Sequence, residues 1–257
     1  MKIVVLVKEV PDTYGDRVLD LETGLADRGA SERVLDEIGE RAIEAAVVLK
    51  EADPDAEVVL VSMGPASVVT GLRKGLAMGA DRAVHILDDA LIGADLSLTA
   101  QVLAAAARRE TPDLVITGVL STDGTGGVIP AMIAEHLGVP QLTALGSITR
   151  DGGRITGARA SDGGTATVSA DLPAVVSITE SLPEARFPNF KGIMAAKKKP
   201  FETVSLADLG LEASVSVPRS IMVSIGQKPP RAGGTVIVDE GDGGVKLAEF
   251  LISNKLV

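Results

Sequence analysis

A short segment rich in serine, threonine and glycine is the part of this sequence best suited to chemistry. Residues 121–127 read Ser-Thr-Asp-Gly-Thr-Gly-Gly, and a helix is expected directly after them, over residues 128–137. Backbone N–H groups and the helix N-terminus would then face a bound anion, and the hydroxyls of Ser121, Thr122 and Thr125 would donate to its phosphate oxygens. The segment is neither a Walker A nor a G-x-G-x-x-G motif, because it lacks the phosphate-binding lysine and spaces its glycines differently. It favours phosphate binding, with a plain helix cap as the alternative.

Charged residues near the start of the chain are the next candidates. Lys8 and Asp12 follow a first apolar run and are suited either to catalysis or to capping a turn. Asp36, Glu37 and Glu40 open a predicted helix, where the helix dipole favours acidic residues, so we interpret them as helix-start residues. The sequence contains no Ser-His-Asp order and no pair of carboxylates arranged for acid–base chemistry. We therefore predict no catalytic residue.

Composition narrows the remaining chemistry. The 257 residues include no cysteine and two histidines, His85 and His136, without ligand spacing, so no metal site is predicted and both are interpreted as structural. The absence of cysteine favours a reducing, cytoplasmic location. A formal net charge of −10, few aromatic residues and a single short basic cluster at residues 197–199 argue against nucleic-acid binding. No apolar run approaches the roughly 20 residues that a bilayer span needs, so no membrane insertion is expected.

The elements that must position these residues follow from the hydrophobic pattern of the first half. Short runs rich in valine, isoleucine and leucine alternate with helical periodicity, which is typical of a parallel sheet covered by helices on both faces. The predicted strands cover residues 2–7, 57–62, 83–87 and 114–118. Ligands bind such sheets beyond the carboxyl ends of the strands. The crevice is therefore expected at residues 8–13, at residues 62–65 and at the loop of residues 121–127.

The second half of the chain changes pattern. Extended segments separated by Asp-Gly-Gly turns are expected to add antiparallel strands to the sheet, at residues 141–149, 153–160, 165–170 and 173–178. From about residue 186, prolines, lysines and glycines break the alternation, until a last helix is predicted over residues 245–254. The fold class is α/β: a Rossmann-like, open, mainly parallel sheet with an antiparallel extension. The expected domains are residues 1–185, which bind a nucleotide, and residues 186–257, an arm laid on a partner.

Motifs spread along nearly the whole chain resemble those of the electron-transfer flavoprotein (ETF) beta-subunit family. They begin with Val-Lys-Glu-Val-Pro-Asp-Thr at residues 7–13 and end with Gly-Ile-Met-Ala-Ala-Lys-Lys-Lys at residues 192–199. Between them lie Glu-Arg-Ala-Ile-Glu, Ser-Met-Gly-Pro, Ala-Met-Gly-Ala-Asp-Arg-Ala-Val-His and Ser-Thr-Asp-Gly, in that order. The order of so many motifs makes the resemblance specific.

The resemblance implies a subunit without an active site of its own. It implies a structural AMP in this chain and a heterodimer with an ETF alpha subunit. The FAD of that subunit accepts electrons from acyl-CoA dehydrogenases of fatty acid oxidation, or from other flavin dehydrogenases, and passes them to ETF-quinone oxidoreductase and the respiratory chain. Positions that match the nucleotide contacts of the family are Leu6, Asp36, Glu37, Ile38, Gly39, Met63, Ser121, Thr122, Asp123, Gly124, Thr125, Gly126, Gly127 and Val128. The helix start reads Asp-Glu-Ile-Gly where many relatives carry Asn-Pro-Phe, so adenosine contacts there are expected from the backbone.

The resemblance also implies a recognition loop that inserts an apolar side chain into the partner dehydrogenase. By position Phe190 is that anchor here, flanked by Ile193 and Met194. Arginine, proline and lysine residues around it favour an exposed loop, and the alternative is that Phe190 packs into its own subunit. The preceding Leu-Pro-Glu-Ala-Arg differs from the usual Leu-Asn-Glu-Pro-Arg of the family.

Two alternatives keep a nucleotide in the crevice. The first is an electron-bifurcating ETF, in which the beta subunit holds a second FAD in place of AMP and oxidises NADH; both ligands contain an AMP moiety and need the same phosphate cradle. The second is a universal-stress-type ATP-binding protein, which shares the open sheet but acts alone. The C-terminal arm argues against the second alternative. Such an arm also predicts that the isolated chain exposes apolar surface and aggregates.

Overall fold

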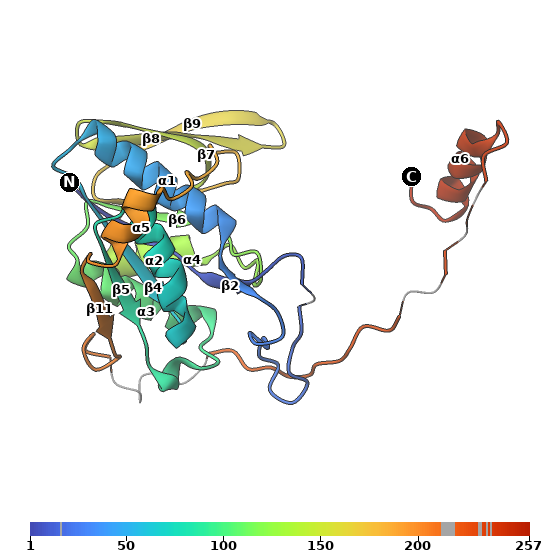
Figure 1. Cartoon of the computed structure of the whole chain (residues 1–257). Coiled ribbons are helices and arrows are strands. Elements are labelled where there is room, and N and C mark those ends of the chain that lie inside the picture. The colour runs from blue at the N-terminus through green and yellow to red at the C-terminus, as the bar shows by residue number, and fades with distance from the viewer. Residues whose placement is uncertain (16, 212–218, 231–232, 235, 237) are drawn as a thin grey trace. The chain divides into compact units, whose positions relative to one another are not determined.

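The structure is a computed structural model that describes residues 1–15, 17–211, 219–230, 233–234, 236 and 238–257. Two compact units, Met1–Val223 and Ser224–Val257, make up the chain. Within the described residues, the first unit contains a nine-stranded sheet with its covering helices (Figure 1). The second contains the helix α6 (Gly243–Ser253).

The sheet of the first unit is mostly parallel. Its strands, in spatial order, are β11 (Phe201–Val204), β5 (Arg82–Ile86), β4 (Glu57–Met63), β1 (Lys2–Leu6), β6 (Leu114–Gly118), β10 (Ala174–Ile178), β7 (Gln141–Asp151), β8 (Arg154–Ser161) and β9 (Gly164–Asp171). The strands predicted from the apolar runs of the first half are confirmed as β1, β4, β5 and β6. The predicted α/β class with a mainly parallel sheet is confirmed as well.

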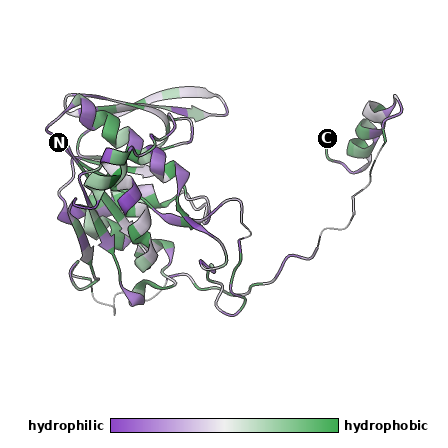
Figure 2. Cartoon of the chain, viewed as in Figure 1, coloured by the Kyte–Doolittle hydropathy of each residue, from purple (hydrophilic) through white to green (hydrophobic). Residues whose placement is uncertain are grey.

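Helices cover both faces of this sheet. The helices α1 (Glu37–Ala52) and α2 (Val69–Met78) pack on one face, and α3 (Leu96–Arg109) and α4 (Ile129–Leu137) pack on the other. Alternate residues of β1 serve the two cores, with Ile3 and Val5 on the α1 side and Val4 and Leu6 on the α3 side. Because both faces are buried, the strands are continuously apolar instead of alternating. Figure 2 shows that the helices, in contrast, carry hydrophobic and hydrophilic residues together.

The antiparallel extension is smaller than predicted. β8 pairs antiparallel with β7 and with β9, as expected, but β10 lies between β6 and β7 and is parallel to both. The prediction of an antiparallel strand at residues 173–178 was therefore wrong. The run Ala-Val-Val-Ser-Ile of β10 is buried along its whole length, and such a run without alternation is typical of a central parallel strand. After β9 the chain returns to the middle of the sheet instead of continuing outward.

Two regular elements occur after residue 186 that the sequence pattern did not predict. The short helix α5 (Phe190–Ala196) packs on α2, and β11 adds a parallel edge strand beside β5. Gly192 allows this close packing, because a Cβ there would overlap the carbonyl oxygen of Ala77. The lysine run at residues 197–199 also has a structural role, because Lys199 Nζ donates to the carbonyl oxygen of Leu76 at 2.9 Å, near the end of α2. A domain boundary at residue 186 and contact of an arm with another subunit stay predictions.

The second unit contains the predicted C-terminal helix. α6 exposes the side chains of Val245, Leu247, Phe250 and Ile252. The unit is too small to bury an apolar surface of its own. Among the residues that the structure describes, none of the helices combines the length and the apolar character that a membrane span requires.

Candidate functional site

A cavity of about 680 Å³ opens at the carboxyl ends of the central parallel strands. From β1 the chain runs outward to β4 and β5 and then returns through α3 to β6, on the other side of β1, so the strand order reverses between β1 and β6 and makes this the switch point of the sheet. Residues at or just after the strand ends line the cavity, among them Leu6, Met63, Leu87 and Gly118. Its size is usual for a small-molecule site. The cavity thus lies where the strand pattern predicted a crevice.

The loop of residues 121–127 forms one rim of this cavity, between β6 and α4. Its turn is closed by the Thr125 N–H, which donates to the Ser121 carbonyl oxygen at 2.9 Å. Gly127 has a φ of 65°, a conformation that glycine adopts without strain. The helix α4 begins at Ile129 without a side-chain cap, so the N–H groups of Ile129 and Ala131 in its first turn are available to an anion, whereas Pro130 has no N–H.

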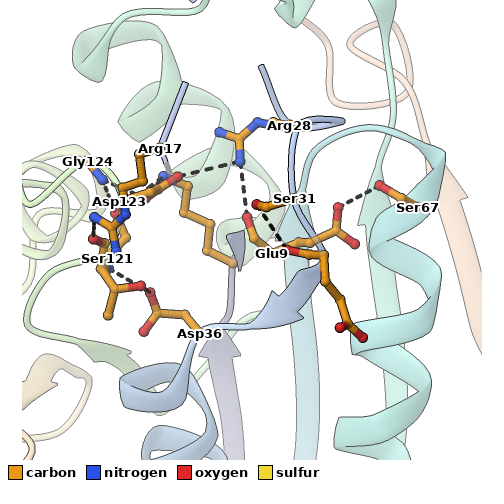
Figure 3. Close-up of polar contacts among 12 residues, drawn as sticks. Glu9, Arg17, Arg28, Ser31, Asp36, Ser67, Ser121, Asp123 and Gly124 are labelled. Atoms are coloured by element: carbon orange, nitrogen blue, oxygen red, sulfur yellow. Dashed lines mark hydrogen bonds and ion pairs between the residues drawn. The ribbon is translucent and has the colours of Figure 1, made fainter. Parts of the chain in front are cut away.

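Asp36 joins this loop to the start of α1 (Figure 3). One carboxylate oxygen accepts a hydrogen bond from the Ile38 N–H at 3.0 Å and caps the helix. The other accepts from the N–H and the hydroxyl of Thr122, at 2.7 and 3.0 Å. The side chain is almost completely buried, so these hydrogen bonds compensate its loss of hydration. The helix-start interpretation of Asp36 is confirmed, and the residue also fixes the position of the loop.

Asp123, next to Thr122 in the loop, holds two cations from distant parts of the chain (Figure 3). Lys8 Nζ lies 2.7 Å from Asp123 Oδ1, and Arg28 Nη1 lies 3.5 Å from Asp123 Oδ2. Burial of the carboxyl group opposes its ionisation, but hydrogen bonds with Lys8, Ser121 and Gly124 and the charge of Lys8 outweigh burial and lower the pKa of Asp123 to about 2. Asp123 is therefore ionised at neutral pH and keeps both cations beside the loop.

Lys8 supplies the lysine that the loop itself lacks. Its side chain lines the cavity, and its Nζ lies 3.3 Å from Ser121 Oγ as well as close to Asp123. Asp12, in contrast, accepts a hydrogen bond from the Tyr14 N–H at 2.9 Å and is a turn residue. Lys8 is therefore part of the cavity wall, whereas Asp12 stabilises a turn.

The four segments predicted to contact a nucleotide all reach the cavity wall. Eight of the fourteen predicted residues line it: Leu6, Asp36, Gly39, Met63, Ser121, Gly124, Gly126 and Gly127. The other six do not belong to the lining: Glu37, Ile38, Thr122, Asp123, Thr125 and Val128. Several of these six have structural contacts instead, as Ile38 packs in the core and Thr122 binds Asp36. Contact of any of the fourteen with a nucleotide stays a prediction.

Two arginines and an apolar wall of the cavity were not predicted from the sequence. Arg28 and Arg33 line it and belong to the excursion, by which we mean residues 12–33, from the end of β2 (Glu9–Pro11) to the start of β3 (Arg33–Leu35). β2 and β3 pair antiparallel and bring the excursion back to the crevice. Strands this short have no detectable periodicity, so the sequence carried no clear signal for them. The apolar wall consists of Leu25, Leu87, Leu91, Ile92, Leu96 and Leu103.

The loop after β4 is held from two sides. The buried His85 places Nε2 2.9 Å from the carbonyl oxygen of Gly64, which lines the cavity beside Met63. On the other side the hydroxyl of Ser67 donates to Glu9 Oε1 at 2.6 Å. His85 therefore has a structural role, as the sequence suggested: it positions the Gly64 carbonyl group of the cavity wall.

The residues predicted to dock a partner lie on α5. Phe190 is 79% exposed, and Ile193 and Met194 are about half exposed. The alternative that Phe190 packs into its own subunit is therefore wrong. Phe187, which the sequence analysis did not single out, is 93% exposed and adds a second aromatic ring just before this helix. Recognition of a partner by these side chains stays a prediction.

An open, mainly parallel sheet with a ligand-sized cavity at its switch point defines a doubly wound α/β protein. The model of the family described as "Electron transfer flavoprotein domain" matches residues 23–209 of the chain. The electron transfer flavoprotein subunit beta of Mycobacterium leprae is 46% identical over 264 residues, which cover 99% of each chain. The proteins of the same description from Mycobacterium tuberculosis strain H37Rv and from Megasphaera elsdenii are 43% and 31% identical, with 99% and 100% of each chain covered.

This chain belongs to the electron-transfer flavoprotein beta-subunit family. It is accordingly an electron-transfer protein, and its family implies an ETF alpha subunit as its partner. The resemblance drawn from the ordered motifs is confirmed. The universal-stress-type alternative is overturned, because the relatives match along almost the whole chain.

Proposed function

We propose that this chain is the non-catalytic beta subunit of a heterodimeric ETF and that it binds a structural AMP in the crevice. The observation that carries the proposal is the rim formed by residues 121–127, fixed by Asp36 and flanked by Lys8. Its backbone N–H groups and a cation suit a phosphate, and the apolar wall of the same cavity suits an adenine ring. In this role the nucleotide takes no part in redox chemistry and holds the strand ends together.

The surface of α5 supports the second half of the proposal, which is docking of dehydrogenases. Phe190 and its neighbours expose apolar side chains beside Lys191, as expected of an anchor surrounded by polar residues. Acyl-CoA or other flavin dehydrogenases would bind here and deliver electrons to the FAD of the alpha subunit. From there electrons pass to ETF-quinone oxidoreductase. The cytoplasmic location stays a prediction from the absence of cysteine.

An electron-bifurcating subunit with a second FAD is the alternative function. The apolar wall, which includes Leu91 and Leu96, supports it, because this wall offers a surface to a second ring system. FAD would supply hydride acceptance from NADH and one-electron transfer. The phosphate loop would serve FAD and AMP equally, so the loop does not distinguish them.

Nucleotide analysis of the purified heterodimer tests the proposal. The chain is produced together with its alpha subunit, the complex is denatured, and the released nucleotides are separated and quantified by chromatography. One AMP and one FAD per heterodimer is the expected result. Two FAD and no AMP would reject the structural-AMP proposal in favour of bifurcation, and a single FAD with no second nucleotide would reject both.

A further inference from the structure

Two cations, Lys8 and Arg28, pair with one carboxylate, that of Asp123, in the loop of residues 121–127. Lys8 approaches one oxygen of Asp123 closely, whereas Arg28 Nη1 lies 3.5 Å from the other, at the limit of a hydrogen bond. The same Nη1 lies 3.3 Å from the carbonyl oxygen of Glu9. The contacts of Arg28 are therefore long, and its guanidinium keeps further N–H groups for another acceptor.

The charge at this rim is positive although the chain as a whole carries −10. Asp36 keeps its negative charge while it binds the α1 N-terminus and Thr122, and the other acidic residues of the lining, Asp88 and Asp89, follow β5 instead of contacting the loop. Among the described residues, the charged side chains in or against the loop of residues 121–127 are three cations, Lys8, Arg17 and Arg28, and two carboxylates, Asp36 and Asp123. Positive charges therefore exceed negative ones by one. An arriving anion would meet a surplus of positive charge beside the loop.

We propose that Arg28 is a phosphate-binding residue of this crevice, which exchanges its long contact with Asp123 for the phosphate of the bound nucleotide. The inference rests on the proposed nucleotide function of the site. A guanidinium presents paired N–H groups that match phosphate oxygens, and charge-assisted hydrogen bonds of this kind are stronger than neutral ones. Lys8 remains on Asp123 and contributes charge from the other side.

The exchange makes the excursion part of the site. Arg28 stands on this segment, so its contact with a phosphate would draw residues 12–33 onto the ligand. It would also make the crevice discriminate between phosphorylated and unphosphorylated nucleosides through a side chain, in addition to the backbone of the loop. A purely structural Arg28, which ties the excursion to Asp123, would produce no such discrimination.

The test compares AMP with adenosine as probes. The complex of the full chain with its alpha subunit is prepared with labelled AMP, and displacement by unlabelled AMP or adenosine gives an apparent affinity for each. Arg28→Ala is expected to lower the apparent affinity for AMP about 10- to 100-fold, the range of a lost charge-assisted hydrogen bond. The apparent affinity for adenosine should stay within about twofold of wild type. Arg28→Lys keeps the positive charge but lacks the paired N–H groups of a guanidinium, so it should recover part of the lost affinity for AMP.

Arg17→Ala is the matched control. Arg17 lies on the same excursion and donates to the Thr122 carbonyl oxygen of the same loop, but it is not part of the cavity lining. This variant loosens the excursion and removes one positive charge beside the loop, but it removes no phosphate contact, so the preference for AMP over adenosine should fall far less than in Arg28→Ala. The proposal is overturned if Arg28→Ala weakens both ligands equally or neither. Failure of the wild-type complex to bind AMP would instead overturn the proposed function.

Discussion

Two carboxylates, Asp36 and Asp123, determine the shape of the rim of the crevice. Asp36 caps α1 and at the same time binds the backbone and hydroxyl of Thr122, so one side chain connects a helix start to a loop 86 residues later in the sequence. Asp123 connects the same loop to Lys8 and Arg28. Because each carboxylate is largely buried, its partners are more important than they would be at the surface. Both residues can be tested separately.

Replacement of Asp36 by alanine is expected to destabilise the chain. The variant loses the helix cap and leaves the N–H groups of Ile38 and Thr122 without their acceptor, which together should lower the free energy of unfolding by about 2–4 kcal/mol. Urea denaturation of the complex with its alpha subunit measures the change. Asp20→Ala removes an exposed carboxylate that also accepts backbone N–H groups, at Glu22 and Thr23, and should cost less than half as much. Equal losses would contradict the special role of Asp36.

Asp123 should make stability depend on acid pH. Its pKa is lowered to about 2 from the ordinary value of 3.8, so the ionised carboxylate stabilises the fold above pH 4 and this contribution is lost as the pH falls through about 2. The contribution is about 2 kcal/mol by linkage. Wild type and Asp123→Asn should therefore differ in unfolding free energy at pH 6 and converge near pH 2. A difference that does not change with pH would refute the assignment.

The short helix α5 carries the proposed docking surface. α5 contains only residues 190–196, too few to form a stable helix alone, and it depends on its packing against α2. Arg186 fixes the chain just before it, because its guanidinium binds Glu44 on α1 at 2.8 Å. The exposed phenylalanines therefore stand on a rigid support even though the segment looks irregular in the sequence.

Gly192→Ala tests this support. The new Cβ would overlap the carbonyl oxygen of Ala77, so α5 must shift away from α2, at a cost of about 1–3 kcal/mol. Gly153→Ala is the control, since that position, with no neighbouring atom within 4 Å of the added Cβ, lies at a hairpin turn. Thermal unfolding should show the lower midpoint for Gly192→Ala alone. Matching midpoints for the two variants would mean that the α5–α2 contact carries little stability.

At the scale of the whole molecule, the two proposed surfaces of the first unit consist of different residues. The proposed nucleotide crevice lies at the carboxyl ends of β1, β4, β5 and β6, while the proposed docking surface lies on α5. A chain with one surface for a nucleotide and another for a protein is suited to assembly. The separation predicts that one surface can be altered without the other.

Phe190→Ala should impair electron transfer without changing the nucleotide content. Loss of an exposed aromatic anchor is expected to reduce the rate of flavin reduction by the partner dehydrogenase about 10- to 30-fold, corresponding to about 1.4–2 kcal/mol. Stopped-flow measurement of the complex, with chromatography of its bound nucleotides, records both quantities. Tyr14→Ala removes a still more exposed ring from the excursion and should leave the rate unchanged. Loss of bound AMP in Phe190→Ala would contradict the separation.

The local pattern of residues determined much of this protein. Apolar runs predicted the four central strands of the first half, because a strand buried on both faces must be apolar throughout. The acidic residues at Asp36 and Glu37 predicted the start of α1, and glycines and hydroxyls predicted the loop between β6 and α4. The expected parallel sheet then placed a crevice at the carboxyl ends of its strands, and the ordered motifs identified the family.

Only the tertiary structure decided which distant residues meet. β10 was misplaced because pairing partners depend on where the chain returns to the sheet, not on the strand itself. β11 and α5 exist because β5 and α2 offer them a surface, so their own short sequences carried no periodic signal. Lys8 and Arg28 meet Asp123 across more than 90 residues of sequence, and such long-range ion pairs depend on the whole fold. Local physics therefore specified the elements, and packing between them specified the site.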